Sequence, residues 1–120
     1  MKPRDYVPAV AENGRRYASP LEERMAAVFK KEGIRYEYGV FFRVGNGGRQ
    51  REVDFVLKTP MRPKRCNNGP VKYIEIKGRI TPAARKQHNE LKEVGVETFI
   101  VTENLIDFYE KNGFLEEDDR

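Results

Sequence analysis

Apolar positions recur at helical spacing in residues 19–33, which predicts an amphipathic helix. The apolar stripe consists of Leu21, Met25, Val28 and Phe29. These positions lie on one face of a helix with 3.6 residues per turn. Ser19 is a favoured N-cap residue, Pro20 suits the first helical position, and Gly33 is a common residue at a helix end. We therefore expect a helix that starts after Ser19 and ends near Gly33.

The remaining pattern predicts four strands and two further helices. Runs rich in β-branched and aromatic residues cover about 34–44, 51–58, 71–77 and 96–102, and such runs are typical of strands. The glycine-rich turn 45–48 joins the first two. A second helix opens at Thr81-Pro82 and ends near Gly95, and a short helix over 104–112 ends at Gly113. The order αβββαβα predicts an α/β fold with a mixed sheet flanked by helices.

The length of 120 residues is sufficient for one domain with its own core. We expect an N-terminal arm or loose lead-in over 1–18, a domain over 19–115 and an acidic tail over 116–120. The arm carries the apolar residues Tyr6, Val7, Val10 and Tyr17. These side chains pack either on a partner chain or on the core of their own chain, and the pattern does not distinguish the two.

Composition excludes several classes of protein. Charged residues make up 35% and aromatic residues 11% of the chain, which is typical of a folded protein rather than a disordered one. The single cysteine, Cys66, excludes an intrachain disulfide, and one histidine makes a Cys/His zinc site untenable. No apolar run is longer than residues 25–29, so we expect no signal peptide, no membrane span and a cytoplasmic location.

Three polar residues in two of the predicted strands form a candidate site. Side chains two positions apart on a strand lie on the same face, roughly 6–7 Å apart, so Glu75 and Lys77 point the same way. The side chain of Asp54 likewise points to the face of its strand opposite to that of its apolar neighbours. If the two strands pair, the two carboxylates converge on one patch, where they suit a hard cation such as Mg²⁺. The alternative is an ordinary solvated sheet face.

Glu22 lies at the flank of the helical stripe and could reach over the edge of the sheet. Its alternative role is local, because Ser19 and Glu22 have the spacing of a capping box. The two roles are compatible.

The net charge of +4 and the pI near 9.2 arise mostly from basic stretches on either side of these carboxylates in the sequence. A basic surface around an acidic centre indicates a polyanion such as nucleic acid; a basic protein without that function is the alternative. The residues expected to contact DNA are Arg43, Arg49, Arg51, Arg62, Lys64, Arg65, Arg79, Arg85, Lys86 and Gln87. Of these, Gln87 is expected to point toward the sheet, with a solvated glutamine on the helix surface as the alternative. His88 is expected at the surface or on a phosphate.

The chain resembles the PD-(D/E)XK nuclease superfamily over residues 15–102. Asp54 matches the first aspartate, Glu75-Ile76-Lys77 matches the Glu-x-Lys motif, and Glu22 matches a helical glutamate that many members carry. The segments that resemble phage endonucleases that resolve Holliday junctions are Ser19-Pro20-Leu21-Glu22, Gly33-Ile34-Arg35-Tyr36-Glu37-Tyr38, Ile74-Glu75-Ile76-Lys77-Gly78 and Arg85-Lys86-Gln87-His88. Two departures are Val53 in place of a proline and a longer, more basic loop over 58–70. Gln87 also matches a helical glutamine of virus-type replication-repair nucleases.

The resemblance implies a restriction-endonuclease-like core that hydrolyses DNA with Mg²⁺, or with Mn²⁺ in its place. It implies that Asp54, Glu75 and the backbone carbonyl of Ile76 hold the metal. Glu22 would bind a second ion directly or through water, and Lys77 would orient the attacking water.

Three functions follow from the sequence. The first is a structure-selective endonuclease for branched DNA; since one domain holds one Glu-x-Lys, two cuts would require a homodimer. The second is a site-specific or replication-repair nuclease for duplex or flapped DNA. The third is a DNA-binding module that has lost catalysis, although the full set of Glu22, Asp54, Glu75 and Lys77 argues against it.

Overall fold

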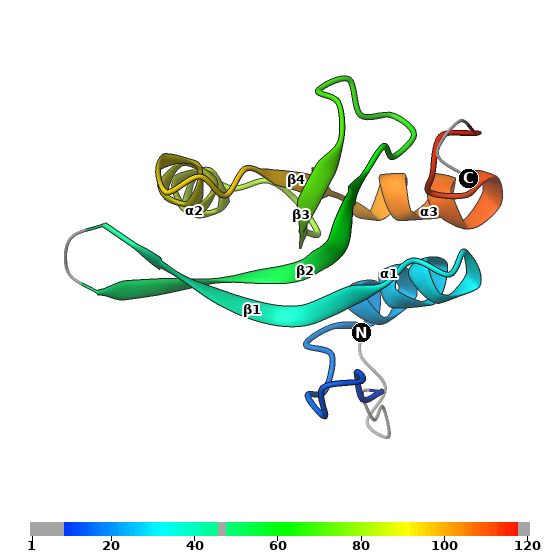
Figure 1. Cartoon of the computed structure of the whole chain (residues 1–120), viewed down its shortest axis with the longest axis horizontal. Helices are drawn as coiled ribbons and strands as arrows, with labels where there is room; N and C mark the ends of the chain where they lie inside the picture. Colours follow the sequence, from blue (N-terminus) through cyan, green and yellow to red (C-terminus); the bar gives the residue numbers. More distant parts are fainter. Residues whose placement is uncertain (1–8, 46–47, 118–120) are drawn as a thin grey trace.

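Three helices and four strands alternate as α1-β1-β2-β3-α2-β4-α3 in the computed structural model, which describes residues 9–45 and 48–117 (Figure 1). Their bounds are α1 Pro20–Lys31, β1 Tyr36–Val44, β2 Arg49–Met61, β3 Val71–Ile76, α2 Pro82–Glu93, β4 Thr98–Val101 and α3 Glu103–Asn112. This order confirms the predicted αβββαβα arrangement.

The strands form a mixed sheet in the order β1-β2-β3-β4. The pairs β1–β2 and β2–β3 are antiparallel, and β4 runs parallel to β3. The parallel pair requires a crossover, which α2 supplies. The expected mixed sheet of an α/β protein is therefore confirmed.

Several strand boundaries differ from the prediction; β4, for example, covers Thr98–Val101 instead of 96–102. β2 extends over Arg49–Met61 instead of about 51–58, because its ladder with β1 continues as far as the Val44–Arg49 pair. β1 begins at Tyr36 rather than at residue 34, because the Ile34 N–H donates to Phe29 O (2.9 Å) at the end of α1. The predicted caps are present: Ser19 Oγ accepts from Glu22 N and Thr81 Oγ1 accepts from Ala84 N.

The core consists of two clusters that place the helices at opposite ends of the β1–β2 hairpin. The larger one packs α1 and α3 against the sheet around Phe29, Phe55 and Phe114. The smaller one joins Leu91 of α2 to Val53 of the hairpin. Figure 1 shows α2 over one end of the hairpin and α1 with α3 at the other. Asp54 lies between Val53 and Phe55, where the two clusters meet.

Arg24 ties α1 to α3. Its guanidinium group makes a two-pronged contact with Glu110 at 3.0 and 2.7 Å and also pairs with Glu103 and Asp107. The carboxylates hold the pKa of Arg24 above its ordinary value, first of all through the Glu110 hydrogen bond. This ion-pair network orients α3 over the sheet.

The segment 9–17 is part of the folded unit rather than a loose lead-in. Ala11 and Tyr17 are buried in the larger core cluster, and Tyr17 Oη lies 2.5 Å from Tyr36 Oη. Tyr17 packs against the aromatic residues of the core. The sequence pattern of this segment did not indicate that contact. Packing on its own chain is thus the correct alternative for Tyr17. Tyr6 and Val7 lie outside the described residues.

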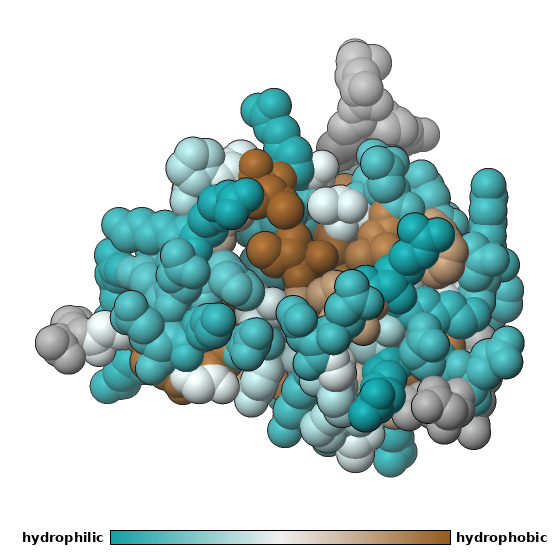
Figure 2. Space-filling view, turned by 90° about the horizontal axis from the view of Figure 1, so that it is seen from above, coloured by the Kyte–Doolittle hydropathy of each residue, from teal (hydrophilic) through white to brown (hydrophobic). Residues whose placement is uncertain are grey.

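The molecular face in Figure 2 is mostly hydrophilic, with a group of hydrophobic side chains near its centre. Within residues 9–45 and 48–117, no helix is long and apolar enough to cross a membrane.

Candidate active site

Asp54 and Glu75 meet where β2 and β3 separate. The strands pair at Phe55–Ile74, so the next residues on one side are Asp54 and Glu75. There the side chains take the place of the backbone ladder. Asp54 Oδ2 accepts from Ile76 N at 2.8 Å, and Glu75 Oε1 accepts from Asp54 N at 3.1 Å. This exchange fixes both carboxylates on neighbouring strands.

The carboxylate of Glu75 is buried, with only 5% of the residue exposed, and Asp54 is half-buried. An ordinary solvated sheet face, the alternative interpretation of this pattern, is therefore wrong for Glu75. A buried carboxylate is costly without partners. The presence of such a buried carboxylate beside a second carboxylate is typical of a functional site.

Lys77 and Gln87 complete the surroundings of Glu75. Lys77 Nζ lies 3.0 Å from Glu75 Oε2, and 28% of the lysine side chain is exposed. Gln87 Nε2 donates to the same oxygen at 3.2 Å and to Glu52 O at 3.1 Å. The expectation that Gln87 points toward the sheet is confirmed. One oxygen of Glu75 thus receives two donors, one charged and one neutral.

Glu22 approaches the pair from the first turn of α1. It is buried, and Ser19 Oγ donates to its Oε2 at 2.9 Å. Tyr38 Oη donates to Glu22 Oε1 at 2.5 Å. The cap contact with Ser19 is present, and Glu22 lies close enough to Asp54 for their charges to interact.

Electrostatics show how closely the carboxylates interact. Burial, together with the negative charges of Glu75 and Glu22, raises the pKa of Asp54 to about 8. Burial also raises the pKa of Glu75, although Lys77 opposes this shift. The site therefore favours the binding of protons or of a cation over the state in which both carboxylates are ionised and without a positive partner.

The donor set of Asp54 and Glu75 suits Mg²⁺. This ion takes oxygen ligands, keeps several waters and is often held by one or two carboxylates. In the part of the chain that the structure describes, no three His, Cys, Asp or Glu side chains gather closely enough to hold a metal ion. Both carboxylate oxygens of Glu22 accept hydrogen bonds, from Tyr38 and from Ser19. This arrangement fits contact with an ion through water better than direct ligation.

Tyr38 is a residue of this site that the sequence pattern did not single out. Its alternating strand position indicated only core or cross-strand packing, and only the tertiary structure brings its hydroxyl group to Glu22. The hydroxyl also accepts from Ala18 N at 2.8 Å.

We expect Tyr38→Phe to weaken the response to Mg²⁺ more than it weakens the fold. Loss of the two hydrogen bonds of the hydroxyl group, to Glu22 and from Ala18 N, should lower the free energy of unfolding by about 1–3 kcal/mol. With the Tyr38 hydrogen bond to Glu22 lost, the Mg²⁺ concentration for half-maximal stabilisation of the protein should rise several-fold. Thermal unfolding at a series of Mg²⁺ concentrations measures this effect.

Tyr36→Phe is the matched control, because it removes the Tyr17–Tyr36 hydrogen bond without touching Glu22. An equal Mg²⁺ response in the two variants would show that Tyr38 acts through stability alone.

The basic residues expected at DNA divide into two groups. Those at the α2 end of the hairpin are Arg43, Arg49, Arg51, Arg85, Lys86 and Gln87, and those near α3 are Arg62, Lys64 and Arg65; Arg79 follows β3 and is exposed. In the first group, Arg49 and Arg51 both pair with Glu90. In the second, Lys64 Nζ donates to Asn112 O, and the Arg65 guanidinium lies 4.1 Å from the Phe108 ring centre. Lys64 and Arg65 thus have intramolecular partners.

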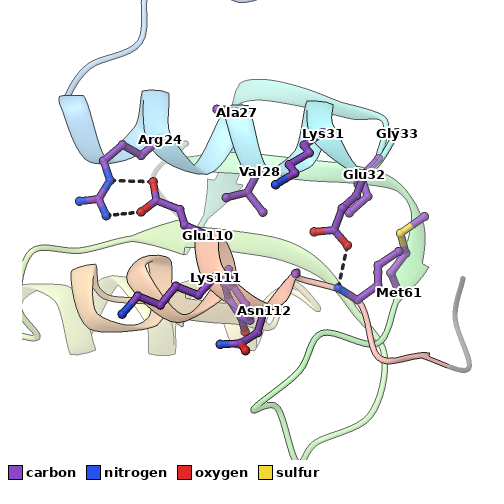
Figure 3. Close-up of a pocket in the computed structure, with 14 residues that line it drawn as sticks. Arg24, Ala27, Val28, Lys31, Glu32, Gly33, Met61, Glu110, Lys111 and Asn112 are labelled. Atoms are coloured by element: carbon purple, nitrogen blue, oxygen red, sulfur yellow. Dashed lines mark hydrogen bonds and ion pairs between the residues drawn. The ribbon is translucent and has the colours of Figure 1, made fainter.

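His88 is half-buried, with Nδ1 2.8 Å from Thr98 Oγ1, beside a cleft of about 390 Å³. A second cleft of about 930 Å³ lies between α1 and α3 (Figure 3). Its wall includes Arg24 with Glu110, and Glu32, whose carboxylate accepts from Phe114 N. None of Glu22, Asp54, Glu75 and Lys77 lines either cleft.

Comparison of the chain with protein-family models, with curated proteins and with solved structures finds no match.

Proposed function

We propose that this protein is a metal-dependent DNA endonuclease that hydrolyses phosphodiester bonds. One observation carries the proposal: the buried Glu75 and the half-buried Asp54 are held side by side by each other's backbone, with Lys77 beside Glu75. Such a pair of mutually repelling carboxylates is stabilised by a divalent cation. The basic balance of the chain, +4, supports a polyanionic substrate.

Asp54 and Glu75 would hold Mg²⁺, or Mn²⁺ in its place, with the Ile76 carbonyl as a further ligand. A bound metal neutralises charge on the phosphoryl oxygens and lowers the pKa of a water nucleophile. Lys77, at 3.0 Å from Glu75 Oε2, places its ammonium group where it orients the water and offsets phosphate charge. Gln87 restrains Glu75 from the other side, so the carboxylate keeps its direction when substrate enters.

Branched DNA is the substrate class that we favour, in the manner of a Holliday junction resolvase. Resolution requires cuts in two strands, and one domain has one Asp54–Glu75 pair, so a two-fold homodimer is part of the proposal. A DNA substrate and a lone cysteine fit the cytoplasm as the compartment.

A second candidate is a replication-repair nuclease that acts on duplex or flapped DNA. The contact between Gln87 and Glu75 at 3.2 Å favours it, because this is the residue on which the resemblance to that group rests. A nuclease of this kind would need only one chain.

One assay separates the candidates. Purified protein is incubated with a four-way junction, a flapped duplex and a plasmid, each with Mg²⁺ or with EDTA. Cleavage of the junction by a species that sediments as a dimer supports the resolvase, and cleavage of the flap or plasmid by a monomer supports the second candidate. Binding without cleavage under all conditions would leave only a DNA-binding module.

Arg85 and Lys86 are exposed on α2, and their joint replacement by alanine should weaken DNA binding on all sequences alike. Each lost phosphate contact reduces the slope of log affinity against log salt by about one unit, so we expect a decrease of about one to two. Affinities measured at several salt concentrations check this.

Lys64→Ala with Arg65→Ala provides the comparison at the α3 end. An equal decrease in its slope would show that DNA extends across both ends of the sheet. An unchanged slope in the Arg85 and Lys86 variant would place the DNA away from α2.

A further inference from the structure

Phe41 on β1 is an exposed aromatic side chain close to the carboxylate pair. It is 54% exposed, although exposure of a phenyl ring brings no gain to the fold. Its partner across the hairpin is Glu52, which lies on the same face of β2 as Asp54 because the two are two residues apart. Phe41 is therefore a diagonal neighbour of Asp54, and such neighbours lie about 7–8 Å apart.

Arg15 lies against the same ring. Its guanidinium carbon is 5.5 Å from the Phe41 ring centre and 5.8 Å from that of Tyr38. The group is held in place by Glu52, with Nη2 2.7 Å from Oε2, and by a hydrogen bond to Gly39 O. A cation near an exposed ring is the combination that proteins use to bind nucleobases and the phosphates that follow them.

Gly39 makes room for this arrangement. It faces Asp54 across the hairpin, between the pairs Tyr38–Phe55 and Val40–Val53, and its φ of +69° favours glycine. A Cβ atom at this position would lie 1.9 Å from Arg15 Nη1 and 2.8 Å from a Glu52 oxygen. The position of Arg15 beside the site therefore depends on a glycine in the middle of a strand, where glycine is otherwise unfavourable.

We propose that Phe41 and Arg15 form a platform that receives one unpaired nucleobase of the DNA substrate. The ring stacks on the base, and Arg15 contacts an adjoining phosphate. Two base steps of stacked DNA span about 7 Å, which is similar to the roughly 7–8 Å expected between diagonal neighbours such as Phe41 and Asp54. The cut would then fall within about two nucleotides of an unpaired base, as at a branch, gap or flap, whereas a fully paired duplex offers no such base. This inference rests on the proposed nuclease function and adds the feature of DNA that the enzyme selects.

Photocross-linking tests the platform without catalysis. A duplex with a one-nucleotide gap carries 5-iodouracil opposite the gap, and a fully paired duplex carries it at the same position. Wild-type protein in EDTA is bound to each and irradiated, and the cross-linked peptide is identified by mass spectrometry. We expect a cross-link to Phe41 with the gapped DNA and a much weaker one with the paired duplex. Absence of a cross-link at residue 41 from gapped DNA that is bound would overturn the proposal.

Affinity measurements with variants supply the second test. Phe41→Leu keeps an apolar side chain but lacks the aromatic face, so affinity for gapped DNA should fall about tenfold. Phe41→Tyr should restore it. Val94→Ala is the control, since Val94 is another exposed hydrophobic residue, at the end of α2. Equal affinity of Phe41→Leu and wild type for gapped DNA would also overturn the platform.

The two proposals fail in different ways. Mg²⁺-dependent cleavage without a cross-link at Phe41 would retain the nuclease and reject the platform. A cross-link at Phe41 without cleavage of any substrate would retain the platform as a DNA-binding surface and reject the nuclease. Protein that binds no DNA would reject both.

Discussion

Glu75→Gln is expected to abolish Mg²⁺-dependent DNA cleavage while the protein stays folded. Glutamine keeps the shape of the side chain and can still accept from Asp54 N, but it removes the negative charge on which cation binding depends. Stabilisation of the transition state by a bound metal is worth several kcal/mol, and each ~1.4 kcal/mol corresponds to a factor of ten in rate. We therefore expect a rate at least about 10³-fold lower, measured by single-turnover cleavage of the preferred substrate.

Asp54→Asn should behave in the same way, and Lys77→Ala should lose about 10²-fold, as expected for one electrostatic donor. Glu93→Gln is the matched control, because Glu93 is an exposed carboxylate at the end of α2. Circular dichroism and DNA binding in EDTA establish that each variant is folded. Full activity of folded Asp54→Asn or Glu75→Gln protein would contradict the assignment of the metal site.

The second large effect concerns stability against pH in the absence of divalent metal. Burial, with the charges of Glu75 and Glu22, raises the pKa of Asp54 from 3.8 to about 8. Between these values the folded protein binds more protons than the unfolded chain, so the free energy of unfolding falls as pH rises. The stabilisation by the proton is complete below about pH 4 and is lost as pH rises through about 8. We expect a loss of about 2–4 kcal/mol between pH 5.5 and 8.5.

Urea denaturation in EDTA at the two pH values measures this loss. Mg²⁺ should stabilise the protein more at pH 8.5 than at pH 5.5, because protons and metal compete for the same oxygens. In Asp54→Asn, the pH dependence over this range should be much smaller than in wild type. Glu37 and Glu110 have lowered pKa values, first of all through hydrogen bonds from Lys58 and Arg24 respectively, and act at lower pH. If the free energy of unfolding of the wild type stays constant or rises from pH 5.5 to 8.5, the ionisation of Asp54 does not destabilise the folded protein, which would contradict this prediction.

Much of the fold could be predicted from local sequence because its signals are local. The stripe that begins at Leu21, the caps Ser19 and Thr81, and the β-branched runs each depend on residues within one element. They were sufficient for the order αβββαβα. The strand ends were less predictable, since β2 extends to Arg49 and Met61 through pairing with its neighbours, and a neighbour is not visible in a local pattern.

The candidate site divides in the same way. Alternation along the two strands indicated that Asp54, Glu75 and Lys77 point away from the apolar core, because side-chain direction follows from a period of two. Alternation does not show whether that other face is wet or covered. Glu75 is buried, and Gln87 of α2, the helix that packs through Leu91, donates to its carboxylate. No spacing within β3 contains that information.

The remaining features depend on contacts between segments that are distant in the chain. Tyr17 packs on the aromatic core, Tyr38 reaches Glu22, and Arg15 reaches Phe41 and Glu52. Composition described these residues only as aromatic or basic. Their roles arise when the hairpin, α1 and segment 9–17 come together, because hydrogen bonds and ring contacts act over a few ångströms, and only the tertiary structure decides which side chains lie within that range.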